Sequence, residues 1–173
     1  MACEVPRKKH VYDCDHFVKN LRNILLRNTL VVDGQMVSVN TMITAYQKLP
    51  AEINLPWTSI RPKSTLKWKP VKALMLTNVK LLIQQQDPQL SALGQYLRFM
   101  KKLYHAFHNN TLTWEHRKQK LRECRQFFDS RVKMLSRDTK RHVVSAIDNV
   151  VHLIEQTPDQ IRDNSDSLAW VPL

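Results

Sequence analysis

Glycine is scarce in this sequence: only Gly34 and Gly94 occur among 173 residues. An all-β sandwich or barrel needs many tight turns, and glycine is one of the few residues that tight turns favour. Loops that cradle phosphate and dinucleotide-binding motifs need clustered glycines. The shortage therefore excludes those sites and favours a helical fold.

Cysteine is scarce as well, and long apolar runs are missing. Cys3, Cys14 and Cys124 are odd in number and widely spaced, which is unlike a disulfide framework and suits a reducing compartment. The charged start MACEVPRKKH is unlike a secretory signal, and the longest apolar run, 73–76, is far too short to span a membrane. We expect a nuclear protein, nucleolar as one option, with the cytoplasm as the alternative.

Acidic residues are few relative to basic ones. The chain carries 27 Lys and Arg against 15 Asp and Glu, which gives a formal net charge of +12. Such an excess indicates an anionic partner: nucleic acid, an acidic protein surface or anionic lipid. Segment 98–141 alone holds 13 basic and 4 acidic residues. Since four acids cannot neutralise thirteen bases, we expect a cationic helical face there.

Apolar spacing predicts an all-α, single-domain bundle of about five to six helices. A proline-rich strap at about 50–70 interrupts it, because prolines at 50, 56, 62 and 70 disfavour one continuous helix. Residues 1–12 are expected to form a basic flexible N-terminus, 13–156 the helical domain, and 157–173 an acidic tail that ends in an apolar segment. The predicted helices cover about 13–28, 38–49, 70–86, 88–108, 112–135 and 136–156.

The segment 30–39 has two interpretations. Asp33-Gly34 between β-branched residues is a hairpin signal. Alternatively, Gly34 ends the first helix as its C-terminal cap. We favour the second slightly, because a lone hairpin has no sheet to join.

Residues Trp114, Leu121, Phe128 and Leu135 recur every seven positions. This spacing suits packing inside one bundle or, as the alternative, a coiled-coil dimer. We favour the intramolecular interpretation.

The candidate contacts to a polyanion are 11 of the basic residues of 98–141 and four of the strap, because arginine and lysine contact the phosphate backbone. They are Arg98, Lys101, Lys102, Arg117, Lys118, Arg122, Arg125, Lys133, Arg137, Lys140, Arg141, Arg61, Lys63, Lys67 and Lys69. Trp57 and Trp68 either stack on bases or, as we favour, pack the strap against the bundle. Trp170 and Leu173 are candidate partner-binding residues in the tail.

No catalytic or metal site is predicted. Cys3, His10, Cys14 and His16 do not have the usual zinc-ligand spacing, and no acidic residue joins His105 and His108 on their helix. Cys124 lies on an apolar stripe, which predicts an inert thiol. The acids are scattered singly, so no acid–base pair stands out. We therefore expect no enzyme activity, no cofactor and no small-molecule substrate.

The leading hypothesis is a non-enzymatic protein that binds nucleic acid through its phosphate backbone, within a nuclear ribonucleoprotein or chromatin assembly. RNA is slightly favoured over DNA, because basic residues interleaved with aromatics suit unpaired bases. Other protein subunits are expected as partners, and a membrane is not. The alternative is a protein–protein adaptor whose basic face and apolar tail dock an acidic protein.

Overall fold

The structure is a computed structural model that describes residues 14–49, 51–60, 69–134 and 136–156. The described part of the chain is mostly helical, with eight α-helices, one short 3-10 helix and a small three-stranded sheet, so the predicted all-α class is confirmed. The elements are α1 (Cys14–Arg27), β1 (Leu30–Val32), β2 (Gln35–Val37), α2 (Val39–Lys48), η1 (Ala51–Ile53), α3 (Trp57–Ile60), α4 (Lys69–Met75), α5 (Val79–Ile83), α6 (Pro88–His108), α7 (Trp114–Arg131), β3 (Val132–Met134) and α8 (Arg137–Gln156).

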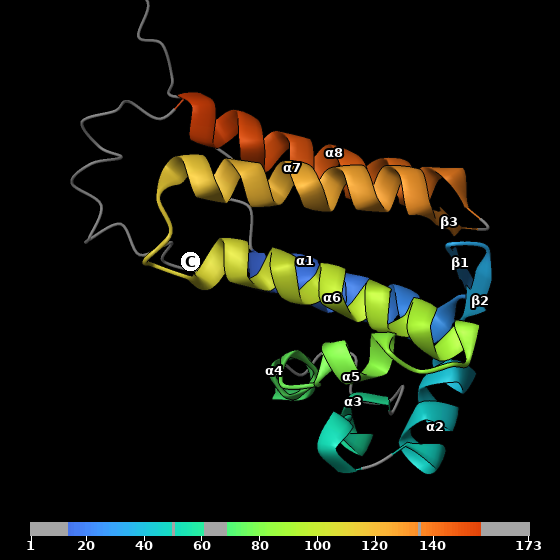
Figure 1. The fold of residues 1–173 in the computed structure, drawn as a ribbon. Coiled ribbons are helices and arrows are strands. Elements are labelled where there is room, and N and C mark those ends of the chain that lie inside the picture. The colour runs from blue at the N-terminus through green and yellow to red at the C-terminus, as the bar shows by residue number, and fades with distance from the viewer. Residues whose placement is uncertain (1–13, 50, 61–68, 135, 157–173) are drawn as a thin grey trace, which may run out of the picture.

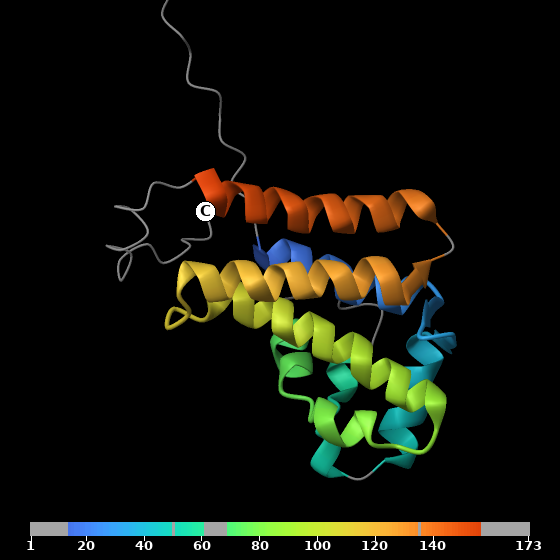
Figure 2. The same ribbon diagram turned by 45° about the horizontal axis from the view of Figure 1, so that its top comes forward.

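Helix α6 is the central element. It begins as the sequence predicts, because the Asp87 side chain accepts a hydrogen bond from the Gln89 N–H at 2.9 Å and Pro88 occupies the first turn. Helices α7 and α8 form an antiparallel layer on one side of α6, while α2 to α5 gather on the other side (Figures 1 and 2). Helix α1 lies behind α6, with the small sheet at one end of the bundle (Figure 1).

The close packing of α5 against α6 explains why position 94 of α6 is a glycine. A Cβ atom added to Gly94 would lie only 2.8 Å from the backbone nitrogen of Ile83, so α5 could not approach α6 with any larger residue there. On the same helix, Tyr96 is fully buried and its hydroxyl donates a hydrogen bond to the Leu21 carbonyl at 3.1 Å. Burial raises the pKa of Tyr96. Helix α6 is thus fixed by packing on both flanks.

The segment 30–37 is a β-hairpin, and the expectation that Gly34 caps the first helix is wrong. Asp33 and Gly34 both have positive φ, 51° and 80°, as a two-residue hairpin turn requires. Strand β3 pairs with the other edge of β1, giving the order β2-β1-β3. The hairpin therefore has the partner that the sequence did not reveal, because β3 lies about a hundred residues away along the chain.

Two predicted helices are shorter in the structure. The expected helix 70–86 divides into α4 and α5, because Asn78 is exposed and caps α5 by accepting a hydrogen bond from Leu81 N–H at 3.4 Å. The expected helix 112–135 ends at Arg131, where β3 begins. In α7, Leu121 and Phe128 are fully buried in this chain's own core, as the intramolecular interpretation of the heptad spacing predicts. Leu135 lies outside the described residues.

The described part of the strap packs against the bundle through a buried polar contact. Arg22 of α1 is fully buried and its Nε donates to the Ser59 carbonyl at 2.9 Å, while the Ser59 hydroxyl donates to the Pro70 carbonyl at 2.7 Å. The Trp57 ring lies 5.1 Å from the Tyr46 ring and remains 37% exposed. Trp57 therefore contacts α2 and remains partly exposed, and Trp68 lies outside the described residues.

Candidate functional site

The outward-facing arginines of α7 are paired with acids of α8. Arg122 Nη2 lies 2.7 Å from Glu155 Oε1. Arg125 Nε lies 2.9 Å from Asp148 Oδ1. These acids are outside the segment 98–141 whose charge excess the sequence emphasised, and only the antiparallel packing of α8 brings them into contact. The outer face of α7 is therefore much closer to neutral than its composition indicates.

Acidic residues within segment 98–141 form ion pairs with further basic residues of the same segment. Lys118 Nζ lies 2.5 Å from Glu115 Oε1 within α7. Asp129 lies 3.7 Å from Arg125 and 3.9 Å from Lys140. These ion pairs reduce the positive charge that is available to a ligand.

Arg117 is not a surface cation, so the expectation that it contacts a polyanion is wrong. Its side chain is buried and donates hydrogen bonds to the carbonyl oxygens of Ala106, Phe107 and Asn109, the latter two at 3.1 and 3.0 Å. Those carbonyls belong to the end of α6, where no helical N–H is available to them. Desolvation lowers the pKa of Arg117, but three carbonyls compensate its charge. Arg117 holds the α6–α7 connection together.

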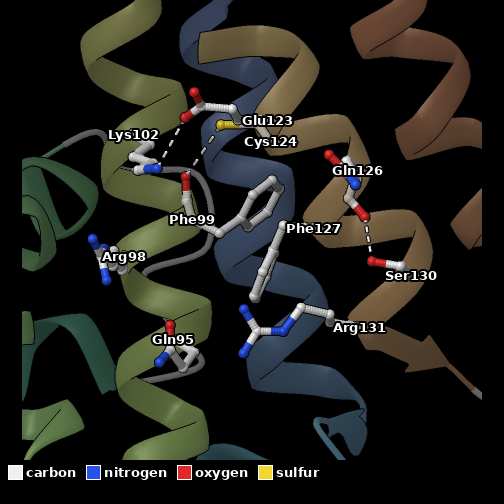
Figure 3. A pocket seen from close by; sticks show the side chains of 10 residues that line it. All are labelled: Gln95, Arg98, Phe99, Lys102, Glu123, Cys124, Gln126, Phe127, Ser130 and Arg131. Carbon is white, nitrogen blue, oxygen red and sulfur yellow. Dashed lines mark hydrogen bonds and ion pairs between the residues drawn. The ribbon is translucent and has the colours of Figure 1, made fainter. Parts of the chain in front are cut away.

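Several other cations meet in a groove between α6 and α7. The groove consists of two hollows of about 430 and 300 Å³ that share Arg98 and Lys102. We call the larger one the aromatic hollow; it is lined by Gln95, Arg98, Phe99, Lys102, Glu123, Cys124, Gln126, Phe127, Ser130 and Arg131 (Figure 3). We call the smaller one the cationic hollow; it is lined by Arg98, Lys101, Lys102, His105, Asn109, Leu112 and Lys120.

Three cations of the groove lack an acidic partner. Among the residues that the structure describes, no carboxylate forms an ion pair with Arg98, Lys101 or Lys120. Lys102, in contrast, lies 3.1 Å from Glu123 across the groove. The cationic hollow therefore contains more cations outside ion pairs than the aromatic hollow does. Hydrogen bonds from Lys102 and Gln119 nevertheless lower the pKa of the Glu123 carboxyl group, and Lys120 is close enough to lower that pKa further.

His105 also lines the cationic hollow, and its pKa responds to burial and to the neighbouring cations. Desolvation and then the nearby Lys101 and Lys120 lower the pKa of His105, with a further contribution from His108. Two lysines from different helices thus act on the same imidazole, which shows that α6 and α7 aim positive charge at one place. A phosphate group at this place would relieve the repulsion among these three groups.

The aromatic hollow has a different character. The Phe99 and Phe127 rings stack at 5.4 Å and 23°, and the guanidinium of Arg131 lies 5.0 Å from the Phe127 ring centre (Figure 3). Arg131 is held by two hydrogen bonds to the Asp33 carboxylate, at 2.6 and 2.5 Å. The turn of the hairpin therefore orients one wall of the groove.

Other predicted contacts lie away from the groove. Lys133 of β3 and Arg137 and Arg141 of α8 are exposed near the far end of the α7–α8 layer, and Lys69 is exposed at the start of α4. The structure brings Arg98, Lys101 and Lys102 together and does not bring these four residues to them. The predictions for Arg61, Lys63, Lys67, Trp68, Trp170 and Leu173, and for the segments 1–12 and 157–173, lie outside the described residues.

Three basic residues of the groove were not among the candidate contacts: Lys120, His105 and Arg131. A signal for them exists in the sequence, because Arg98, Lys102, His105 and Asn109 recur at helical spacing and mark one polar stripe on α6. Lys120 and Arg131 are likewise on one stripe of α7. What the sequence could not show is that these two stripes face the same groove.

The structure also places the residues considered for catalysis and metal binding. Cys124 is buried, and burial raises its pKa to about 12, so the thiol is inert as predicted. His108 Nε2 lies 2.7 Å from Asp15 Oδ1, an acid that α1 contributes and that the sequence did not associate with it. Within the described residues, no three histidine, cysteine, aspartate or glutamate side chains form a set that could hold a metal ion. None of the described helices is both long enough and apolar enough to cross a membrane.

Comparison with known proteins gives no relative: no protein-family model, curated protein or solved structure matches the chain. The functional argument therefore depends on the geometry and charge of this molecule alone.

Proposed function

We propose that this protein binds nucleic acid through its phosphate backbone, and that the α6–α7 groove is the binding surface. The observation that supports the proposal is the convergence of Arg98, Lys101 and Lys120, three cations without an acidic partner among the described residues, on one concave site. Phosphate oxygens are the ligands that such a site accommodates without specific base contacts.

The groove replaces the outer face of α7 as the expected contact surface. Arg122 and Arg125 would first have to leave Glu155 and Asp148 to reach a phosphate. Arg98, Lys101 and Lys120 have no such competitor among the described residues. A role within a nuclear ribonucleoprotein or chromatin assembly remains part of this proposal, with RNA favoured over DNA.

The test is the salt dependence of binding to fluorescent single-stranded RNA of about 20 nucleotides, measured by anisotropy. Replacing Arg98, Lys101 and Lys120 by glutamine should weaken binding. It should also reduce the slope of log K against log salt by about 2, since each lost phosphate contact contributes about 0.7 for a single strand.

A matched control removes the same number of charges elsewhere. Lys48, Lys72 and Lys80 are exposed on the α2–α5 side of α6, so their replacement by glutamine lowers the net charge equally. This control should keep most of the slope. Equal losses in both variants, or no binding by the unmodified protein, would refute the proposal. Tighter binding to polyglutamate than to RNA would instead support the adaptor alternative.

A further inference from the structure

The aromatic hollow contains two phenylalanine rings as well as positively charged side chains. It combines a ring stack, Phe99 on Phe127, with the flat guanidinium of Arg131 beyond it (Figure 3). Flat apolar and guanidinium surfaces are the groups on which proteins stack unpaired nucleobases. Phe99 belongs to the hydrophobic core, and the partly buried Phe127 packs against it at the wall of the hollow.

Packing and hydrogen bonds hold the stacked groups in place without a ligand. Phe99 is buried and contacts the rings of Tyr96 and Phe128 at 5.8 and 5.3 Å. At the other end, the Asp33 carboxylate fixes the Arg131 guanidinium through two hydrogen bonds. A ligand that stacks here therefore loses little free energy to ordering of the site.

Polar groups suited to a base edge border the same hollow. Gln95 of α6 and Gln126 of α7 are at least partly exposed, and the structure shows neither side-chain amide bonded to another described residue. An amide both donates and accepts hydrogen bonds, so it can match the paired donor and acceptor of a base edge. Together with the ring stack, these amides line a cavity of about 430 Å³, a size typical of small-molecule sites.

The acid of the groove indicates which end takes the phosphates. Glu123 accepts hydrogen bonds from Lys102 at 3.1 Å and from Gln119 at 3.2 Å, and these bonds lower its pKa, so it stays ionised. Glu123 neutralises Lys102, and Asp33 neutralises Arg131, so Arg98 is the one cation lining the aromatic hollow that forms no ion pair with a described acid. The aromatic hollow therefore attracts phosphate oxygens less than the cationic hollow does. The phosphates are thereby directed to the cationic hollow, where Lys101 and Lys120 form no ion pair with a described acid.

We propose that the aromatic hollow binds an unpaired nucleobase while the cationic hollow holds the adjoining phosphates, so that the ligand of the groove is single-stranded nucleic acid. This inference rests on the proposed function and names its ligand class. In a duplex the faces of the bases are covered by their neighbours, and they cannot reach a ring stack that lies within a groove between two helices.

Abasic oligonucleotides test the base site separately from the phosphate site. A 10-nucleotide oligouridine and an abasic strand of the same length carry equal charge but differ in their bases. The unmodified protein should bind oligouridine about 5- to 10-fold more tightly, which corresponds to stacking of one base. The slope against salt should be the same for both strands, because their phosphates are the same.

Phe127→Leu removes the ring and keeps most of its apolar volume. This variant should bind oligouridine only as tightly as the abasic strand, while its affinity for the abasic strand stays that of the unmodified protein. Gln126→Ala, at an exposed position, provides a second variant that cannot disturb the core and should lose part of the same preference. Oligodeoxyuridine measured in parallel shows whether the 2′-hydroxyl contributes.

The possible outcomes separate this inference from the proposed function. Equal binding of oligouridine and abasic strands by the unmodified protein overturns the base site and leaves phosphate binding intact. Duplex RNA that binds as tightly as oligouridine, and that Phe127→Leu weakens equally, overturns it as well. Absence of binding to every strand refutes the proposed function itself.

Discussion

Arg117 and Arg98 carry the same charge and lie in opposite environments. Arg117 is buried and donates to three carbonyl oxygens at the end of α6, whereas Arg98 is exposed on the groove. In the sequence, both arginines belong to the basic segment 98–141. Only the structure separates an arginine that stabilises a helix end from one that is available to a ligand.

Arg117→Met should lower the free energy of unfolding by about 3 kcal/mol, because it leaves buried carbonyls without a donor. Arg98→Met is the matched control at an exposed position and should change it by less than about 0.5 kcal/mol. Urea unfolding measures both. RNA binding should show the opposite pattern. Arg98→Met should reduce the slope of log K against log salt, and Arg117→Met should leave that slope unchanged. Equal stability of the two variants would contradict the role given to Arg117.

At the residue scale, local sequence patterns predict a buried thiol or a helix cap, but they do not predict which charged side chains are already paired with a distant residue. The buried thiol of Cys124 and the cap at Asp87 follow from local patterns, since an apolar stripe and an Asp-Pro pair are each visible within a few residues. The contact between His108 and Asp15 joins residues 93 positions apart. No local spacing contains that information.

At the scale of elements, helices were predicted well and their ends less well. The long helices α6 and α8 match their expected ranges, because an apolar face and a capping residue define each. The break at Asn78 and the strand β3 were missed. Asn78 N–H donates to the Ile53 carbonyl at 2.7 Å, and β3 pairs with β1, so both features depend on distant segments. The groove shares this dependence, since two helices form it.

The ion pairs between α7 and α8 allow a prediction at this scale. Glu155→Gln should release Arg122, and Asp148→Asn should leave Arg125 only its longer contact with Asp129. RNA binding should therefore tighten, and the salt slope should steepen by up to about 1.4 if both arginines reach a phosphate. Each pair is about half exposed, so the loss of stability should stay below about 1 kcal/mol per pair.

Adding Arg122→Gln and Arg125→Gln to this variant serves as the control. The four-fold variant lacks both members of each pair, and its salt slope should return to that of the unmodified protein. A steeper slope that persists in the four-fold variant would show that the added affinity comes from the lost acids alone and not from contacts by the two arginines.

At the scale of the whole molecule, the net charge of +12 is unevenly compensated. Ion pairs across α7 and α8 neutralise one side of the helical layer, and the groove between α6 and α7 retains positive charge. This distribution predicts a pH dependence of binding. The free protein holds the pKa of His105 below its ordinary value, through desolvation and through Lys101, Lys120 and His108.

A phosphate bound in the cationic hollow would neutralise Lys101 and Lys120 and so raise the pKa of His105 in the complex. Binding then takes up a proton, and linkage requires that affinity increase as pH falls through the pKa of the complex, levelling off below the pKa of the free protein. Affinity therefore increases as pH decreases, because His105 binds more protons in the complex than in the free protein. Anisotropy between pH 8 and pH 5.5 at constant salt measures it.

The ligand and the neighbouring acid do not obscure this dependence. The charge of a phosphodiester is constant over this range, and the lowered pKa of Glu123 keeps that carboxylate ionised. His105→Asn should abolish most of the pH dependence while keeping the affinity at pH 8. His108→Asn, which removes the imidazole paired with Asp15 outside the groove, should retain the pH dependence but shift it to higher pH, because His108 no longer lowers the pKa of His105. If His105→Asn binds RNA with an unchanged pH profile, the phosphates do not lie beside Lys101 and Lys120, and the groove is not the binding surface.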